Sequence, residues 1–107
     1  MNKEQQKTLK AVLTYDKACR YIFTHYGEKM QKTQLIQELS ELITALTKND
    51  IVNMIEEMAD VQIMLDQFKF TFQMINRDMQ KIAKRKINRQ LRRIKNEIEV
   101  CKCNKNS

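Results

Sequence analysis

The chain has 107 residues, a formal net charge of +7, one glycine, no proline and no tryptophan. This length allows one small domain and is too short for two, and the composition favours helices over strands and turns. No run free of Asp, Glu, Lys and Arg exceeds seven residues, far short of the roughly 18 apolar residues of a membrane span. Three cysteines do not make a disulfide framework, and the polar start does not resemble a signal peptide. We therefore expect an all-α cytoplasmic protein that does not enter the membrane.

The positive charge is concentrated in the last part of the chain. Residues 1–76 contain 9 basic and 10 acidic side chains, whereas residues 77–107 contain 11 basic and 3 acidic ones. A basic segment of this kind indicates contact with phosphates or another acidic partner, or simply a solvated face.

Apolar residues recur at helical spacing in four segments, 4–26, 30–46, 51–74 and 77–99. Gly27 is suited to the left-handed cap that ends the first helix, and a break near residues 75–78 separates the last two. The connection at residues 47–50 is short, which predicts an antiparallel hairpin of the second and third helices. Asn49 or Asp50 can cap the third helix. We expect a single domain over residues 1–100 and a disordered tail over 101–107.

The third helix is apolar around most of its circumference in its first half, as is typical of a helix in the centre of a bundle. The chain has only seven aromatic residues, so a core built from one copy would be thin. We therefore expect a bundle of about four helices that is completed by oligomerisation.

Four acidic residues stand out because they lie next to apolar positions on the two helices of the predicted hairpin. Glu38 and Glu41 are one turn apart on the second helix, and Glu57 and Asp60 are one turn apart on the third. If the chain folds back about residue 49, Glu38 becomes level with Asp60, and Glu41 with Glu57. Two such pairs across a hairpin predict one cluster of four carboxylates, although a single pair of this kind is usually a solvated helix face.

Clustered carboxylates repel one another, and a divalent cation relieves that repulsion. Oxygen ligands without histidine or cysteine nearby favour Mg²⁺, with Mn²⁺ as a possible substitute. His25, the single histidine, has no visible catalytic partner and is expected to cap a helix or to lie partly buried.

The acidic motifs and their flanks resemble the MazG-like nucleoside triphosphate pyrophosphohydrolases, a branch of the all-α NTP pyrophosphatase superfamily. In this family E-x-x-E is followed by E-x-x-D across a helical hairpin, and here fifteen residues separate Glu38-Leu-Ser-Glu41 from Glu57-Met-Ala-Asp60. The flanking stretches HYGEKMQ, EEMADVQIML and KINRQLRRI look like the small phage-type branch, and the resemblance covers about residues 20–95. One departure is Gln37, where the family often has Glu, but this position is not one of the four acids.

The resemblance implies an enzyme that binds Mg²⁺ through Glu38, Glu41, Glu57 and Asp60, which would also be its catalytic residues. It would cleave a nucleoside or deoxynucleoside triphosphate between the α and β phosphates, giving the monophosphate and pyrophosphate. The family assembles as homodimers or homotetramers, with the site completed between chains. Which base or sugar is preferred does not follow from the motifs.

The basic fourth helix has more than one interpretation. Lys86, Arg89 and Arg93 flank its apolar stripe, so they could bind the phosphates of the substrate; we call them the phosphate-binding candidates. Alternatively, the helix binds nucleic acid by charge, and the protein is a small basic nucleic-acid-binding protein whose acidic residues are structural. For most basic residues of this segment a solvated face is the simplest expectation.

Overall fold

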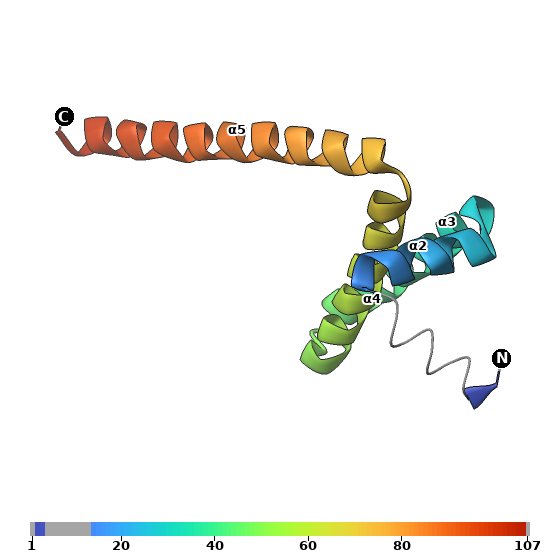
Figure 1. The fold of residues 1–107 in the computed structure, drawn as a ribbon. Helices are drawn as coiled ribbons and strands as arrows, with labels where there is room; N and C mark the ends of the chain where they lie inside the picture. The colour runs from blue at the N-terminus through green and yellow to red at the C-terminus, as the bar shows by residue number, and fades with distance from the viewer. Residues whose placement is uncertain (1, 4–13, 107) are drawn as a thin grey trace. The chain divides into compact units, whose positions relative to one another are not determined.

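The computed structural model describes residues 2–3 and 14–106, and over this range it contains helices and no strands. The helices are α2 (Tyr15–Tyr26), α3 (Glu28–Thr47), α4 (Ile51–Thr71) and α5 (Gln73–Asn106) (Figure 1). The predicted all-α class is confirmed. Residues 4–13 of the first predicted helix lie outside the described residues.

Gly27 separates α2 from α3. Its backbone N–H donates to the carbonyl of Phe23 at 2.8 Å, and its φ is 88°. A side chain at this position would meet no atom within 4 Å, so it is the positive φ, and not lack of space, that favours glycine here.

The connection between α3 and α4 ends in a side-chain cap. Asp50 accepts a hydrogen bond from the backbone N–H of Asn53 at 3.2 Å and another from the Asn53 side-chain amide at 2.8 Å. Asn49 adopts a positive φ of 52°, which asparagine tolerates better than most residues. Of the two predicted capping residues, Asp50 is therefore the one that caps α4.

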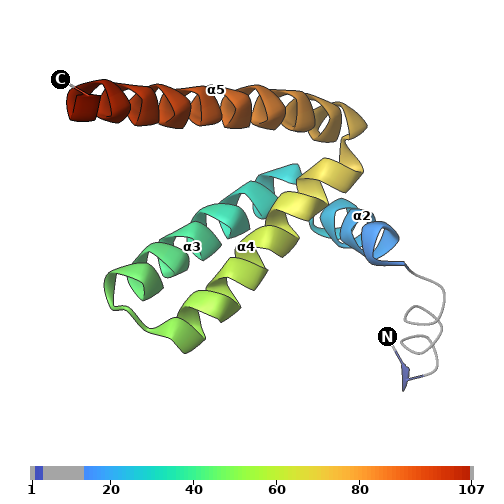
Figure 2. The ribbon, with the colours of Figure 1, turned by 90° about the vertical axis from the view of Figure 1, so that its left-hand side faces the viewer.

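Helix α4 packs against both α2 and α3, and the two views show it beside α3 (Figure 2). The small core contains Cys19 and Phe23 of α2 and Val61 and Met64 of α4, each no more than 8% exposed. The Phe23 ring makes an edge-to-face contact with Phe68, with centroids 4.9 Å apart. Such a contact adds about 1 kcal/mol to the stabilisation from buried area.

Polar groups also lie in this core. The side-chain amide of Gln31 in α3 donates to Gln67 Oε1 in α4 at 2.6 Å, and both residues are buried. A buried amide without a partner is costly, so this pair restricts how α3 and α4 can pack.

The break between the last two helices lies at Phe72, a few residues before the predicted position of 75–78. Phe72 has extended dihedral angles, φ −114° and ψ 96°, and its ring contacts Phe23 with centroids 5.4 Å apart. The third helix therefore ends at Thr71, earlier than the predicted residue 74.

Helix α5 belongs to the second of two compact units, which comprise residues 1–73 and 74–107. It continues through Asn106, whereas the sequence predicts a disordered tail from residue 101. The chain has no glycine or proline after residue 27, so no residue type that ends helices follows. Across the described part of the chain, none of the helices combines the length and apolarity that a membrane crossing requires.

Candidate metal centre

Three of the four predicted acids converge between α3 and α4. One carboxylate oxygen each of Glu38, Glu41 and Glu57 can be chosen so that all three atoms lie within 4.8 Å of one another. Glu38 and Glu57 are half-buried, whereas Glu41 is exposed. Asp60 is exposed and is not part of this group. We call Glu38, Glu41 and Glu57 the acidic group.

The acidic group contains two carboxylate oxygens that are buried and have no hydrogen-bond partner within the described residues, Glu38 Oε2 and Glu57 Oε2. The second oxygen of Glu38 accepts from the side-chain amide of Gln34 at 2.8 Å. Buried polar atoms are nearly always paired, and a carboxylate oxygen that cannot reach a donor is especially costly. Acidic side chains often gather on a surface without an ion, but these two atoms indicate that something is needed to satisfy them.

The electrostatics of the group point the same way. Burial and the neighbouring carboxylates of Glu41, Asp60 and Glu38 raise the pKa of Glu57 to about 7. Burial is the largest cause, and a hydrogen bond with Glu41 is the next. Asp60 thus acts on Glu57 electrostatically although it lies outside the acidic group.

The donor set fits a hard divalent cation. All three residues offer carboxylate oxygens, which Mg²⁺ and Mn²⁺ prefer, and two of these oxygens lack another partner.

Gln37 donates to Glu41 Oε1 at 3.2 Å. The residue that departs from the family pattern therefore helps to orient one of the acids.

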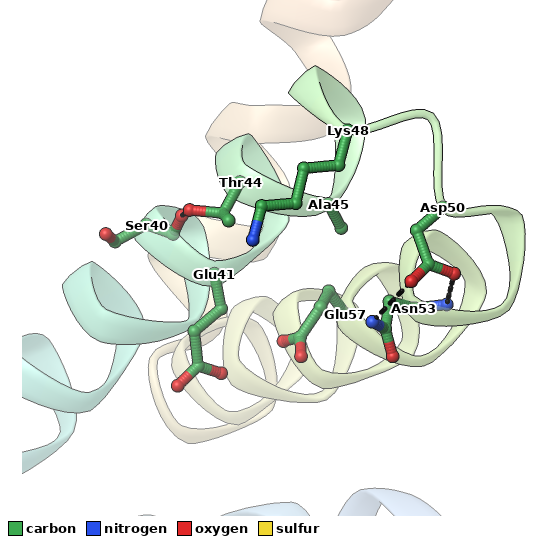
Figure 3. A pocket seen from close by; sticks show the side chains of 8 residues that line it. All are labelled: Ser40, Glu41, Thr44, Ala45, Lys48, Asp50, Asn53 and Glu57. Carbon is green, nitrogen blue, oxygen red and sulfur yellow. Dashed lines mark hydrogen bonds between the residues drawn. The ribbon is translucent and has the colours of Figure 1, made fainter.

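A pocket of about 270 Å³ adjoins the acidic group and includes two of its members. Its lining residues are Ser40, Glu41, Thr44, Ala45, Lys48, Asp50, Asn53 and Glu57. Figure 3 shows the side chains of Glu41 and Glu57 reaching toward the same space from α3 and α4. The pocket is therefore a space in which a ligand could contact the acids directly.

Lys48 brings a positive charge to this pocket and is not among the residues predicted from the sequence. Its side chain extends from the end of α3 toward the level of Glu41 (Figure 3). The sequence does contain a signal, because Lys48 follows Glu41 by seven residues, which is two helical turns on the same face. A lysine beside a group of carboxylates that could hold a cation is suited to bind a phosphate oxygen.

The phosphate-binding candidates Lys86, Arg89 and Arg93 are exposed on α5. They belong to the second compact unit, whereas the acidic group and the pocket belong to the first. Their contact with a nucleotide stays a prediction.

Asp66 of α4 lies outside the acidic group and has a structural role. It is buried and accepts hydrogen bonds from the Tyr15 hydroxyl at 2.6 Å and the Gln62 amide at 2.9 Å. Lys69 Nζ lies 3.7 Å from its Oδ1. The hydrogen bond to Asp66, assisted by burial, raises the pKa of Tyr15 well above its usual range. Asp66 thus connects α2 to α4.

Comparison with protein families, with characterised proteins and with solved structures gives no match to this chain. The interpretation of the acidic group therefore depends on its own residues and on the motif resemblance.

Proposed function

We propose that this protein is a Mg²⁺-dependent nucleoside triphosphate pyrophosphohydrolase of the MazG-like type. It would convert a nucleoside or deoxynucleoside triphosphate to the monophosphate and pyrophosphate. The observation that carries the proposal is the acidic group, in which Glu38, Glu41 and Glu57 lie together with two buried oxygens that lack partners.

The residues of the first unit fit the parts of such a reaction. Glu38, Glu41 and Glu57 would hold the cation, and Asp60, one turn beyond Glu57, would complete the set of four acids. A bound Mg²⁺ would neutralise phosphate charge and lower the pKa of a coordinated water. Lys48, which lines the same pocket as Glu41 and Glu57, would bind a phosphate oxygen.

The bond that breaks lies between the α-phosphorus and the oxygen that bridges to the β-phosphate. Water adds its oxygen to the α-phosphorus, and the pyrophosphate leaves with the bridging oxygen. A carboxylate oxygen of the acidic group that does not contact the ion can accept the proton of the attacking water.

The proposal includes an antiparallel hairpin of α3 and α4 and assembly of two or four chains. Several large apolar residues of these helices are more than 60% exposed: Ile36, Ile43, Ile51, Val52 and Ile55. Large apolar side chains exposed to this degree on two helices of a small protein favour an interaction site. A second copy of the chain would cover it and would bring further residues to the pocket.

The test is a panel of NTPs and dNTPs incubated with Mg²⁺ or Mn²⁺ in water enriched in ¹⁸O. The proposal predicts monophosphate and pyrophosphate as products, with the heavy oxygen in the monophosphate. Glu41→Gln should abolish turnover, whereas Glu28→Gln should not, because Glu28 makes only an exposed ion pair with Lys32 at 3.0 Å. Absence of hydrolysis across the panel with both ions would refute the proposal. Release of a nucleoside diphosphate and orthophosphate would instead show cleavage between the β and γ phosphates, which is a different reaction.

The alternative function, nucleic-acid binding, rests on the exposed basic residues of α5. It predicts salt-sensitive binding of duplex DNA or RNA and no hydrolysis of free nucleotides. The same purified protein can be tested for both activities.

A further inference from the structure

Helix α5 carries an apolar stripe that is open to solvent. Ile87, Leu91, Ile94 and Ile98 are each more than half exposed. The helix has 34 residues, which corresponds to a length of about 51 Å. Four large aliphatic residues in one row on an exposed helix indicate a surface that is covered by a partner.

The spacing of this row is that of a coiled coil. The apolar positions 87, 91, 94, 98 and 101 follow one another at steps of four, three, four and three residues. This alternation averages 3.5 residues, the repeat that keeps one seam facing a partner helix in a left-handed supercoil. Leu91 and Ile98 then occupy heptad position a, and Ile87, Ile94 and Cys101 occupy position d.

The charges of α5 agree with this assignment. No charged residue lies at a or d between Ile87 and Cys101. The outward positions b, c and f instead hold the basic residues Arg85, Lys86, Arg89, Arg92 and Arg93. A partner helix at the seam would therefore bury apolar side chains and leave the basic ones in water.

The flanking positions favour a second copy of α5 in parallel orientation. Glu97 lies at position g and Lys102 at the following e, and these two positions of opposite chains meet in a parallel pair. In an antiparallel pair, e positions would face e positions and bring Lys95 and Lys102 of the two chains together, which is repulsive.

The lengths of the helices also favour a partner outside the chain. Helices α3 and α4 have 20 and 21 residues, whereas α5 has 34. Even complete coverage of α5 by a helix as long as α4 would leave 13 of its residues uncovered.

We propose that residues 87–101 of α5 form a parallel coiled coil with the same residues of further copies of the chain. Leu91 at position a with Ile87 and Ile94 at position d favours more than two strands. The phosphate-binding candidates Lys86, Arg89 and Arg93 all lie at outward positions, so the pairing leaves them accessible. This inference requires neither the metal nor hydrolysis, and it can fail while the proposed function holds.

The two cysteines near the end of α5 allow a direct test in the full chain. In a parallel pair Cys101, at position d, faces its own counterpart, and the two backbones approach within the range that a disulfide requires. Cys103 lies at outward position f and is the matched control. Cys19 is only 2% exposed and takes no part. With diamide as oxidant, two thiols would form one Sγ–Sγ bond, and their two protons and two electrons would reduce the N=N bond of diamide.

On a non-reducing gel, Cys103→Ser should give a covalent dimer as efficiently as the unmodified sequence, and Cys101→Ser should lose it. In the Cys103→Ser background, Leu91→Glu should abolish the crosslink and Asn96→Glu, at outward position f, should not. Sedimentation should show that Leu91→Glu loses the association of chains through α5.

Three outcomes would overturn the proposal. The first is equal crosslinking through Cys101 and Cys103. The second is a stable dimer without a Cys101 crosslink, which would indicate an antiparallel pair or another interface. The third is a folded monomer that buries α5 against its own chain.

Discussion

Replacing Glu57 with Gln should have opposite effects in the absence and in the presence of a divalent cation. The folded-state pKa of Glu57 is raised to about 7, above the value of about 4.3 expected for an unfolded chain. A raised carboxyl pKa stabilises the fold below the unfolded value, and that contribution is lost as pH rises through the folded value. Without metal, Glu57→Gln should therefore raise the melting temperature at pH 8 and change it little at pH 4.

Metal binding should follow the ionisation of the same carboxyl. With a pKa of about 7, roughly one tenth of Glu57 is ionised at pH 6 and roughly nine tenths at pH 8. Because a cation competes with the proton, the apparent affinity for Mg²⁺ or Mn²⁺ should rise about tenfold between these values. In Glu57→Gln this pH dependence should disappear together with most of the binding.

Thermal melts at pH 4, pH 6 and pH 8, with EDTA or with Mn²⁺, test both effects. An ion at about 100 times its dissociation constant stabilises the folded state by roughly 2.7 kcal/mol, which should raise the melting temperature of the unmodified protein at pH 8. Glu28→Gln, with the same chemical change at an exposed ion pair, should retain the metal response. A Glu57→Gln variant that melts lower without metal at pH 8 and keeps the full metal-induced rise would refute this interpretation of the acidic group.

Three further predictions concern the rest of the chain. Asp60→Asn should lower turnover by about 100-fold or more while the circular dichroism spectrum is unchanged, and near-normal turnover would remove Asp60 from the site. Tyr15→Phe should lower the free energy of unfolding in urea by about 1–3 kcal/mol, because the buried carboxylate of Asp66 loses a hydrogen bond; an unchanged midpoint would contradict that role. Alanine at each phosphate-binding candidate should impair nucleotide turnover. Binding of DNA that weakens steeply with salt, with a slope of log K against log salt concentration near −0.9 per neutralised phosphate, would favour the nucleic-acid alternative.

Two helix boundaries were predictable because a single residue determines each of them. Gly27 has the positive φ that its position required, and Asp50 caps α4 through its own side chain. The convergence of Glu41 with Glu57 also followed from counting residues from the connection between the helices. In each case a short-range rule, of dihedral preference or of helical rise, was sufficient.

The features that the sequence did not predict depend on contacts between distant residues. The helix ends at Phe72 where that ring packs on Phe23, and phenylalanine itself carries no signal for a break. The hydrogen bond from Tyr15 to Asp66 joins residues 51 positions apart. Neither the break nor this contact can be recognised from local propensity.

Asp60 illustrates the limit of counting residues from the connection between α3 and α4. Residues three apart on a helix differ by about 60° around its axis, so two residues can be level with a partner helix and only one can face it. Glu57 lies within the acidic group, and Asp60 lies exposed at its edge. The position of Asp60 along the helix axis was predictable. Which side of each helix faces the other depends on packing between them, for example on the buried hydrogen bond between Gln31 and Gln67.

The raised pKa of Glu57 explains how the acidic group can exist in the fold before a ligand binds. At neutral pH about half of the molecules carry a proton on this carboxyl, which reduces the repulsion among the three acids. A cation that displaces the proton would leave the three carboxylates ionised and would supply a partner for the buried oxygens of Glu38 and Glu57. The proton in the metal-free state and the cation in the metal-bound state would each reduce the repulsion among the carboxylates. The acids would then keep the same positions in both states. We therefore expect exchange of a proton for a divalent ion at the acidic group to require little rearrangement of the surrounding helices.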